Sequence, residues 1–369
     1  MATYYVDPLN GLDSNNGSSV FLAFKSTAKS ETVVAPGDTV KFLSTQAESL
    51  IGTNTITMSA SGTTANPIYW QGCDSSGNAL SDGSYYTVDG TGMSSGIDII
   101  NTGSKTNRRM RNMLFANAKR FAVSCTADPS YTIQFELCSI TSPTTACFGS
   151  PNLSVGYGFV VINSVFTGSG AGGTQRFSYN ISGGANRSDV SCIGCSIAAF
   201  NTVFAQDWSN GSGLIYANIF STNGTVLPGS IYDQGQWVQG NVFYGNSYCV
   251  GISDRTVTGG GRYVSIVNNT FVNNSKCIDG YDVTVSTVVN SYNHFFGNAS
   301  NYSGGSIVAG SHEIGGDPLF NSPGTLDFRL KSGSPLIGAG PRGVNVAGLA
   351  QIGSGSGGGV PLIGEGLVF

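Results

Sequence analysis

The chain has 369 residues, of which 10% are charged, 11% are aromatic and 53 are glycine, and its formal net charge is -4. This charge, without any run of Lys and Arg, excludes a typical nucleic-acid-binding surface, and an acidic polymer as partner would require a local basic patch. No apolar stretch reaches the roughly 18 residues that a membrane-spanning helix needs. Residues 1–7 lack the basic and apolar regions of a secretory signal peptide, so we expect neither a signal peptide nor a membrane span.

The first 45 residues are expected to close one end of a repeat. They hold three short motifs, Tyr4–Asp7, Gly11–Gly17 and Pro36–Val40, and a short helix is expected between Thr27 and Ala35. A cap is needed because the first strand of a stacked repeat otherwise exposes an edge that pairs with other molecules. The sequence thus predicts three parts, which are a cap at residues 1–45, a repeat domain at residues 46–340 and a tail at residues 341–369.

From Arg111 to Phe295, a small polar residue keeps returning two or three positions before a Phe or Ile. It recurs at intervals of 23 to 32 residues, at Asn112, Cys138, Asn163, Cys195, Asn218, Asn241, Asn269 and Asn293. Between these positions lie short runs rich in Val, Ile and Phe, and none keeps a helical period. Three short strands per repeat, stacked in parallel, predict a parallel β-helix of about ten coils between Tyr86 and Leu330.

The recurring polar residue is expected to lie at one corner of successive coils. Stacked Asn amides there donate and accept hydrogen bonds along the axis, and the candidates for this ladder are Asn112, Asn163, Asn218, Asn241, Asn269 and Asn293. Cys138 and Cys195 fall in the same column, and a second column follows eight residues later at Cys249 and Cys277. These thiols are expected to be buried and free. Cys192 and Cys195 form a lone C-x-x-C, and no second pair completes a metal site.

The C-terminal part begins with three short motifs at Gly316–Phe320, Leu326–Leu330 and Ser332–Gly340. A Gly- and Ser-rich linker at 353–359 then leads to an apolar end. Two arrangements of this end stay open, because it can fold back as a cap or dock on a neighbouring subunit.

The motifs at both ends resemble those of the right-handed parallel β-helix proteins of the pectate-lyase-like superfamily. The N-terminal match covers Tyr-Tyr-Val-Asp at 4–7 and Pro-Gly-Asp-Thr-Val at 36–40, whereas Phe42–Leu50 lacks the usual Gly-Thr-Tyr. The resemblance implies an all-β, right-handed, single-stranded parallel β-helix with an N-terminal cap, a closing coil formed by the three motifs at 316–340, and an extended C-terminal tail. The superfamily includes polysaccharide lyases, glycosidases, phage tailspikes and non-catalytic surface proteins, so this fold leaves the activity open.

Four carboxylates fall at nearly the same place in consecutive repeats, and they are the candidate catalytic residues: Asp207, Asp233, Asp254 and Asp282. Carboxylates on neighbouring or next-but-one coils can approach the separations of retaining or inverting glycosidases. Side chains close by in sequence are candidate substrate-binding residues, namely Trp208, Trp237, Arg255 and Tyr281. The competing interpretation is that Asp simply caps turns at this corner. A Ca²⁺ site is a third interpretation, and no other cofactor or metal is expected.

A lyase also needs a cation to neutralise the uronate carboxylate. The candidates are Lys105, Arg108, Arg109 and Arg111, for which a solvated turn is the competing interpretation, and the pair Arg255 and Arg262. His294 is expected at a corner and His312 in a loop, and no Ser-His-Asp or two-His metal spacing is present.

Two functions follow. The first is a non-enzymatic bacteriophage virion protein, such as a capsid decoration, head fibre or tail component, assembled in the host cytoplasm and able to bind a surface glycan. Its partners would be other virion proteins or copies of itself, and the resemblance suggests a trimer. The alternative is a polysaccharide lyase or glycoside hydrolase acting on the outer face of the β-helix. Nucleic acid and membrane are not expected as partners.

Overall fold

The computed structural model describes residues 1–125, 133–150, 157–169, 175–180, 188–205, 214–228, 236–252, 263–280, 287–305 and 307–340. The chain forms a right-handed parallel β-helix with almost no α-helix, as the sequence predicts. The chain divides into two compact units. Unit 1 holds residues 1–167 and 178–186, and unit 2 holds residues 168–177 and 187–369.

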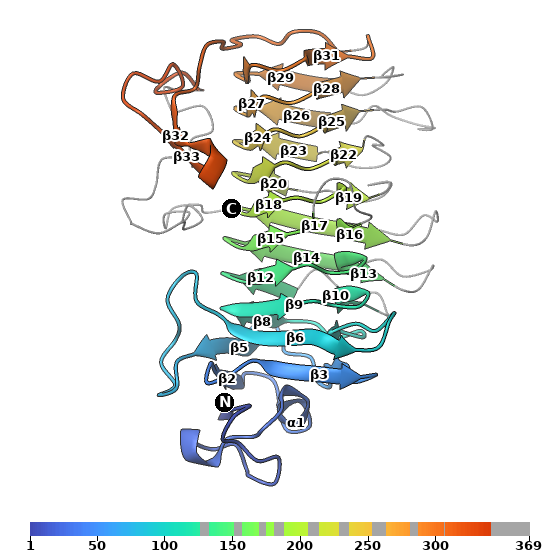
Figure 1. The fold of residues 1–369 in the computed structure, drawn as a ribbon, viewed down its shortest axis with the longest axis vertical. Helices are drawn as coiled ribbons and strands as arrows, with labels where there is room; N and C mark the ends of the chain where they lie inside the picture. The colour runs from blue at the N-terminus through green and yellow to red at the C-terminus, as the bar shows by residue number, and fades with distance from the viewer. Residues whose placement is uncertain are drawn as a thin grey trace. The chain divides into compact units, whose positions relative to one another are not determined.

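In unit 1 the strands form three parallel sheets (Figure 1). Sheet A consists of β1 (Thr3–Val6), β2 (Thr39–Leu43), β5 (Ile68–Cys73), β8 (Arg108–Arg111), β11 (Ile133–Glu136) and β14 (Tyr157–Ile162). Sheet B consists of β3 (Glu48–Gly52), β6 (Tyr86–Met93), β9 (Met113–Ala116), β12 (Ser139–Thr141) and β15 (Val165–Thr167). Sheet C consists of β4 (Ile56–Thr57), β7 (Ile100–Asn101), β10 (Phe121–Ser124) and β13 (Ala146–Ser150).

Unit 2 repeats this three-sheet arrangement. Its sheet A consists of β17 (Ser188–Ile193), β20 (Leu214–Tyr216), β23 (Gln236–Gln239), β26 (Tyr263–Val267) and β29 (Thr287–Ser291). Sheet B consists of β18 (Ser196–Ala198), β21 (Ile219–Ser221), β24 (Val242–Tyr244), β27 (Thr270–Val272) and β30 (His294–Phe296). Sheet C consists of β19 (Thr202–Ala205), β22 (Thr225–Pro228), β25 (Tyr248–Ile252), β28 (Lys276–Gly280) and β31 (Ser300–Ser303). Strand β16 (Arg176–Asn180) has residues of both units.

The number of coils is smaller than predicted. Among the described residues between Tyr86 and Leu330, the sheet A strand recurs from β8 to β29, which makes about 8 turns instead of about ten. The difference arises after Ile314, whose parallel bridge to His294 is the last pairing with the coils among the described residues. The predicted closing coil at 316–340 is instead a hairpin of β32 (Phe320–Ser322) and β33 (Asp327–Leu330), joined by the 3-10 helix η2 (Pro323–Thr325).

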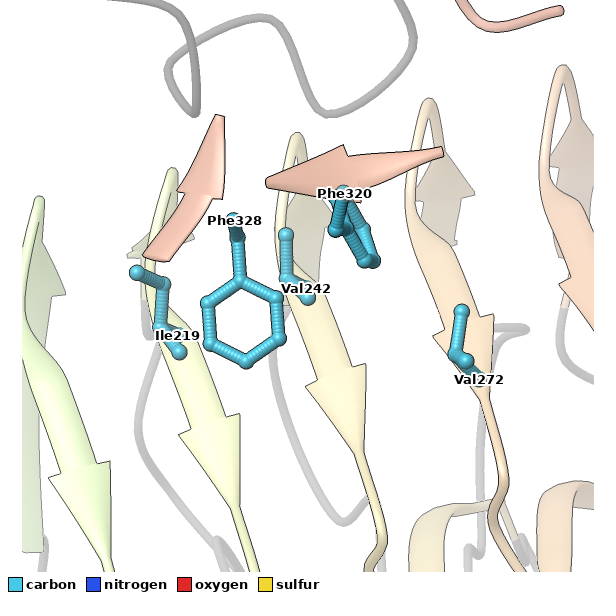
Figure 2. Packing of buried hydrophobic residues seen from close by; sticks show 5 residues of the cluster. All are labelled: Ile219, Val242, Val272, Phe320 and Phe328. Atoms are coloured by element: carbon cyan, nitrogen blue, oxygen red, sulfur yellow. The ribbon is translucent and has the colours of Figure 1, made fainter. Parts of the chain in front are cut away.

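This hairpin segment, residues 316–340, is called the strap below. It packs against the outward side of sheet B in unit 2, where Phe320 and Phe328 contact Ile219, Val242 and Val272 (Figure 2). Antiparallel pairing closes the hairpin on itself, so its backbone groups need no partner in the coils.

Inside unit 2, identical residues stack in register. Phe220, Phe243, Phe271 and Phe295 form a column with ring centroids 5.1, 4.7 and 5.1 Å apart. The predicted Asn ladder is confirmed for four members, since Asn218, Asn241, Asn269 and Asn293 are linked by side-chain hydrogen bonds of 3.1, 2.9 and 3.1 Å. A second ladder, which we did not predict, joins Asn223, Asn246, Asn274 and Asn298.

The prediction of the first two ladder members, Asn112 and Asn163, is wrong by one position. Asn112 and Asn163 have φ of 55° and 47°, so they occupy the left-handed corner that precedes the ladder position. The register of sheet B puts Met113 and Ser164 beside Cys138 in the ladder column. The Ser164 hydroxyl accepts a hydrogen bond from the Cys138 amide at 3.0 Å, as the Asn side chains do elsewhere.

The cysteines follow the prediction. All eight are free and buried, and the register of sheet C places Cys249 beside Cys277. Burial raises the pKa of the Cys249 thiol well above its ordinary value, so this column is packed interior and not a reactive site.

The N-terminal cap covers the free edge of β1. Asp7 N donates to Phe24 O at 2.8 Å and Phe24 N donates to Tyr5 O at 2.9 Å, which satisfies the edge that would otherwise pair with another chain. The predicted helix is present as α1 (Thr27–Glu31), and the side chain of Ser26 caps its start. Glu48 holds this helix to the first coil, because its carboxylate accepts bonds from the Thr27 amide at 2.9 Å and the Tyr86 hydroxyl at 2.8 Å.

Candidate functional site

Three residues of the cation cluster, Arg108, Arg109 and Arg111, lie in a strand and not in a solvated turn, whereas Lys105 lies in the turn before it, where its amide bonds to Thr102 O at 3.0 Å. Residues Arg108–Arg111 form β8, in which successive side chains point to opposite faces of sheet A. Arg108 is 1% exposed and pairs with Glu31, whereas Arg109 and Arg111 stand on the outward face. The prediction of a turn failed for these residues because Arg108 and Arg109 are adjacent and equally charged, which hides the alternation of buried and exposed positions that strand pairing imposes.

Two columns of polar side chains cross the outward face of sheet A in unit 1. Strand pairing places Tyr69 beside Arg109 in one column. In the other column it places Lys41 beside Gln71, Gln71 beside Arg111, and Arg111 beside Glu136. Neighbouring strands lie about 4.8 Å apart, so three cations gather within a few strand spacings. We call this surface the cationic face, and it consists of Lys41, Tyr69, Gln71, Arg109, Arg111 and Glu136.

The contacts on the cationic face leave its charged groups accessible. The Arg109 guanidinium lies 5.6 Å from the centre of the Tyr69 ring, and the ring is 37% exposed. Arg111 Nε lies 3.8 Å from Glu136 Oε1, with both side chains nearly half exposed. An exposed pair at this distance contributes little to stability, so both arginines remain able to bind an anionic ligand.

A turn at residues 74–80 borders this face. Lys41 Nζ donates to Gly77 O at 2.8 Å and lies 5.8 Å from the centre of the Tyr5 ring. The Cys73 thiol at the start of the turn is not a candidate nucleophile, because burial raises its pKa to about 11.

The outward face of sheet A in unit 2 has a different character. Trp237, one of the predicted substrate-binding residues, is 41% exposed there, and Tyr263 is 46% exposed. Strand pairing places Ser265 beside Trp237, and Gln239 Nε2 donates to Ser265 Oγ at 2.8 Å. Exposed aromatic rings beside amide and hydroxyl groups can stack on sugars, and the side chain of Trp237 is accessible for this. Its role in substrate binding stays a prediction.

The other predicted site residues lie outside the described residues. In chain order they fall between a strand of sheet C and the next strand of sheet A, and they are Asp207, Trp208, Asp233, Asp254, Arg255, Tyr281 and Asp282. Arg262 falls in the same kind of segment. Their catalytic and binding roles, and the Ca²⁺ interpretation, therefore stay predictions.

A carboxylate that we did not single out, Asp279, lies at the end of β28. Tyr248 donates to its Oδ2 at 3.1 Å, Ser303 donates to its Oδ1 at 2.7 Å, and Lys276 Nζ is 3.9 Å away. These partners come from β25, β28 and β31, so Asp279 links three successive coils. Both of its oxygens already accept bonds, which favours a structural role.

Over the described ranges, no group of three or more His, Cys, Asp or Glu is arranged to hold a metal ion. In the same ranges, no helix is both long and apolar enough to cross a membrane.

Comparisons with known proteins concern the fold. No model of a known protein family matches the chain, and no curated protein sequence gives a significant match. Among solved structures, the chain is similar to the pectate lyase Pel9A with 17% identity and a TM-score of 0.56, over 95% of this chain and 96% of that one. This chain therefore has the pectate-lyase-like β-helix fold. A rhamnogalacturonan lyase is similar with 14% identity and a TM-score of 0.50, over 87% of this chain and 91% of that one.

Proposed function

We propose that this chain binds an anionic polysaccharide on the cationic face and cleaves it as a lyase. The observation that carries the proposal is the assembly of Lys41, Arg109 and Arg111 on one exposed side of sheet A, next to the Tyr69 ring. The sequence shows no Lys/Arg run and thus no basic patch, but strand pairing creates one.

The columns suit a linear polymer of acidic sugars. A polymer lying across the strands meets a new side chain about every 4.8 Å, so it can engage several members of a column at once. Each guanidinium offers paired N–H donors to a uronate carboxylate, and Tyr69 offers an aromatic surface to a sugar ring.

The same cations fit the electrostatic demand of elimination. A base removes the proton from the carbon beside the uronate carboxylate, a carbon–carbon double bond forms, and the glycosidic oxygen leaves with the bonding electrons. Negative charge builds up on the carboxylate before the oxygen leaves, and cations placed beside it lower the barrier. Arg109 and Arg111 would hold and neutralise this carboxylate.

The two solved structures reported above are both lyases by name, which agrees with the alternative from the sequence. The virion hypothesis receives no comparable support. It stays distinguishable, because a virion protein of this fold would bind a glycan without cleaving it.

The experiment compares the wild type with Arg109→Gln/Arg111→Gln on polygalacturonate, rhamnogalacturonan and alginate. Binding is followed by affinity electrophoresis, and cleavage by the ultraviolet absorbance of the unsaturated product. Losing two charge-assisted contacts should weaken binding on the order of tenfold or more and abolish cleavage. The matched control, Lys25→Gln/Lys331→Gln, removes the same charge from two exposed positions elsewhere and should behave as wild type.

Each result decides between functions. Equal activity of the two double variants would remove the cationic face as the site. Binding by the wild type without product from any polymer would support a non-catalytic glycan-binding protein. Cleavage that yields new reducing ends but no unsaturated product would favour hydrolysis, and Asp233→Asn/Asp254→Asn would then be the variant to test.

A further inference from the structure

The strap covers one side of unit 2 with apolar contacts. Phe328 lies between Ile219 and Val242, and Phe320 lies near Val242 and Val272 (Figure 2). Burying two phenylalanine rings against aliphatic side chains favours docking of the strap.

Polar atoms on the same face of sheet B oppose docking. Ser221 Oγ, Thr270 Oγ1 and His294 Nδ1 are buried, and within the described residues none of them has a hydrogen-bond partner. Each of the three residues is the first or the third residue of a three-residue strand. The central residue of each strand is one of the stacked phenylalanines inside the coil, so the three polar side chains point outward. The covered face therefore combines apolar contacts with unsatisfied polar groups, whose burial is unfavourable.

His294 connects this face directly to the strap. It is 0% exposed, and its Nε2 lies 2.7 Å from the carbonyl oxygen of Gly316, where the strap begins. Because a carbonyl only accepts, Nε2 must carry the proton of the neutral ring. The remaining nitrogen, Nδ1, is thus the atom that a second proton would occupy.

The charges around His294 compensate only in part for such a proton. Asp317 on the strap is the carboxylate whose charge acts on the ring, and it favours protonation. Glu313 is next to Ile314, which pairs with His294, but its carboxylate accepts bonds from Tyr302 and from the Gly310 amide at 2.6 Å.

The other elements that pack against the His294 ring add little to the charge of Asp317 and Glu313. Strand β27 contributes the neutral Thr270 beside the ring, and in the hairpin Asp327 pairs with Arg329. Burial is the largest influence and lowers the pKa of His294 below its ordinary value of 6.5, against the raising effects of the Gly316 carbonyl and Asp317.

We propose that the strap is a pH-dependent lid, released from sheet B of unit 2 when His294 is protonated. In the docked state the ring is neutral and donates to Gly316. A second proton places an imidazolium under the strap with its Nδ1–H facing no acceptor among the described residues, so the ring becomes charged most readily when the strap has left.

The sign of the pH dependence follows from the lowered pKa. A released His294 binds protons more readily than a docked one, so proton binding favours release. Docking has its full strength above about pH 6.5 and weakens as the pH falls below that value. Release exposes the apolar side chains of Ile219, Val242 and Val272, so the molecule presents an apolar strip only in acid.

The test is hydrogen exchange of the strap in the full chain, measured as protection factors corrected for the intrinsic rate. The amide of Lys331 bonds to Leu319 O at 2.8 Å within the hairpin, and it reports the docked strap because an isolated two-stranded hairpin is only marginally stable in water. Between about pH 7 and about pH 5, its protection should fall by on the order of tenfold if docking lowers the pKa of His294 by about one unit, and by about thirtyfold at most, because pH 5 lies about 1.5 units below the ordinary pKa of 6.5.

The chain has 2 histidines, which provides a matched pair of variants. His294→Gln keeps a donor near the Nε2 position and cannot titrate, so its protection should not change with pH. His312, stacked on Tyr292 with ring centroids 4.5 Å apart, is the control, and His312→Gln should behave as wild type.

Two results would overturn the proposal. One is wild-type protection that stays constant over this pH range, and the other is an unchanged pH dependence in His294→Gln. If His294→Gln is unprotected at both pH values, the imidazole signal of His294, assigned by comparison with His312→Gln, decides instead. A wild-type pKa at or above the ordinary 6.5 would then refute the lid.

Discussion

Breaking the buried ion pair between Arg108 and Glu31 should strongly destabilise unit 1, and this can be tested by a single substitution. The guanidinium makes two bonds to the carboxylate, with Nη1–Oε1 at 2.8 Å and Nη2–Oε2 at 2.6 Å. Arg108 Nε also donates to Ala60 O at 2.9 Å. Trp70 Nε1 and the Ser59 amide donate to the same carboxylate at 3.2 and 2.9 Å, so the pair joins α1 to the coils.

Arg108→Met preserves much of the side-chain volume and removes the charge. It leaves the Glu31 carboxylate buried without its countercharge and deprives the Ala60 carbonyl of its donor. Removing one partner of a buried pair costs about 3–5 kcal/mol, which for a unit of this size lowers Tm by about 6–20 °C. Arg108→Met/Glu31→Leu replaces both charges with apolar groups and should lose less stability than Arg108→Met alone.

The assay is denaturant unfolding followed by far-ultraviolet circular dichroism. Arg109→Met is the matched control, because it makes the same change one residue later on the exposed side of β8 and should alter the free energy of unfolding by about 0.5 kcal/mol or less. The reasoning fails if Arg108→Met and Arg109→Met lose equal stability, or if the double variant is the least stable of the set.

Three further predictions concern the ladder, the strap and the cap. Asn241→Ala interrupts the first Asn ladder within its length and should cost about 2–4 kcal/mol in thermal unfolding, clearly more than Asn298→Ala at the partly buried end of the second Asn ladder. Phe328→Ala removes a ring from the strap's contacts and should speed exchange of the Lys331 amide at neutral pH while the coils stay protected. Glu48→Gln tests the cap: burial raises the pKa of Glu48 above 4.5, against the lowering effect of its bonds to Thr27 and Tyr86, so the folded state binds this proton more tightly than the unfolded state. The wild type should therefore lose stability relative to Glu48→Gln as the pH rises from about 4.5 through the raised pKa, and parallel pH profiles would contradict this.

The sequence was informative where the fold is local and periodic. The spacing of short apolar runs predicts a parallel β-helix because each coil repeats the same three strands and corners. The Asn ladder could be recognised from Asn218 to Asn293, since every coil there supplies the same residue. At Asn112 and Asn163 the register was one position off, because Asn suits both the left-handed corner and the ladder position next to it.

The candidate site depended on contacts between distant parts of the chain. Parallel pairing brings successive coils into register and thereby places four distant residues on one face, namely Lys41, Tyr69, Arg109 and Glu136. The segments between them differ in length, so the sequence does not reveal that they share this face. Arg108 and Arg109 are chemically alike and adjacent, yet one is buried and the other exposed, since alternate side chains of a strand point to opposite faces. The strap was predicted as a coil because its motifs resemble the closing coil of the pectate-lyase-like superfamily. In the structure it instead packs on the apolar side of sheet B in unit 2, through Phe320 and Phe328.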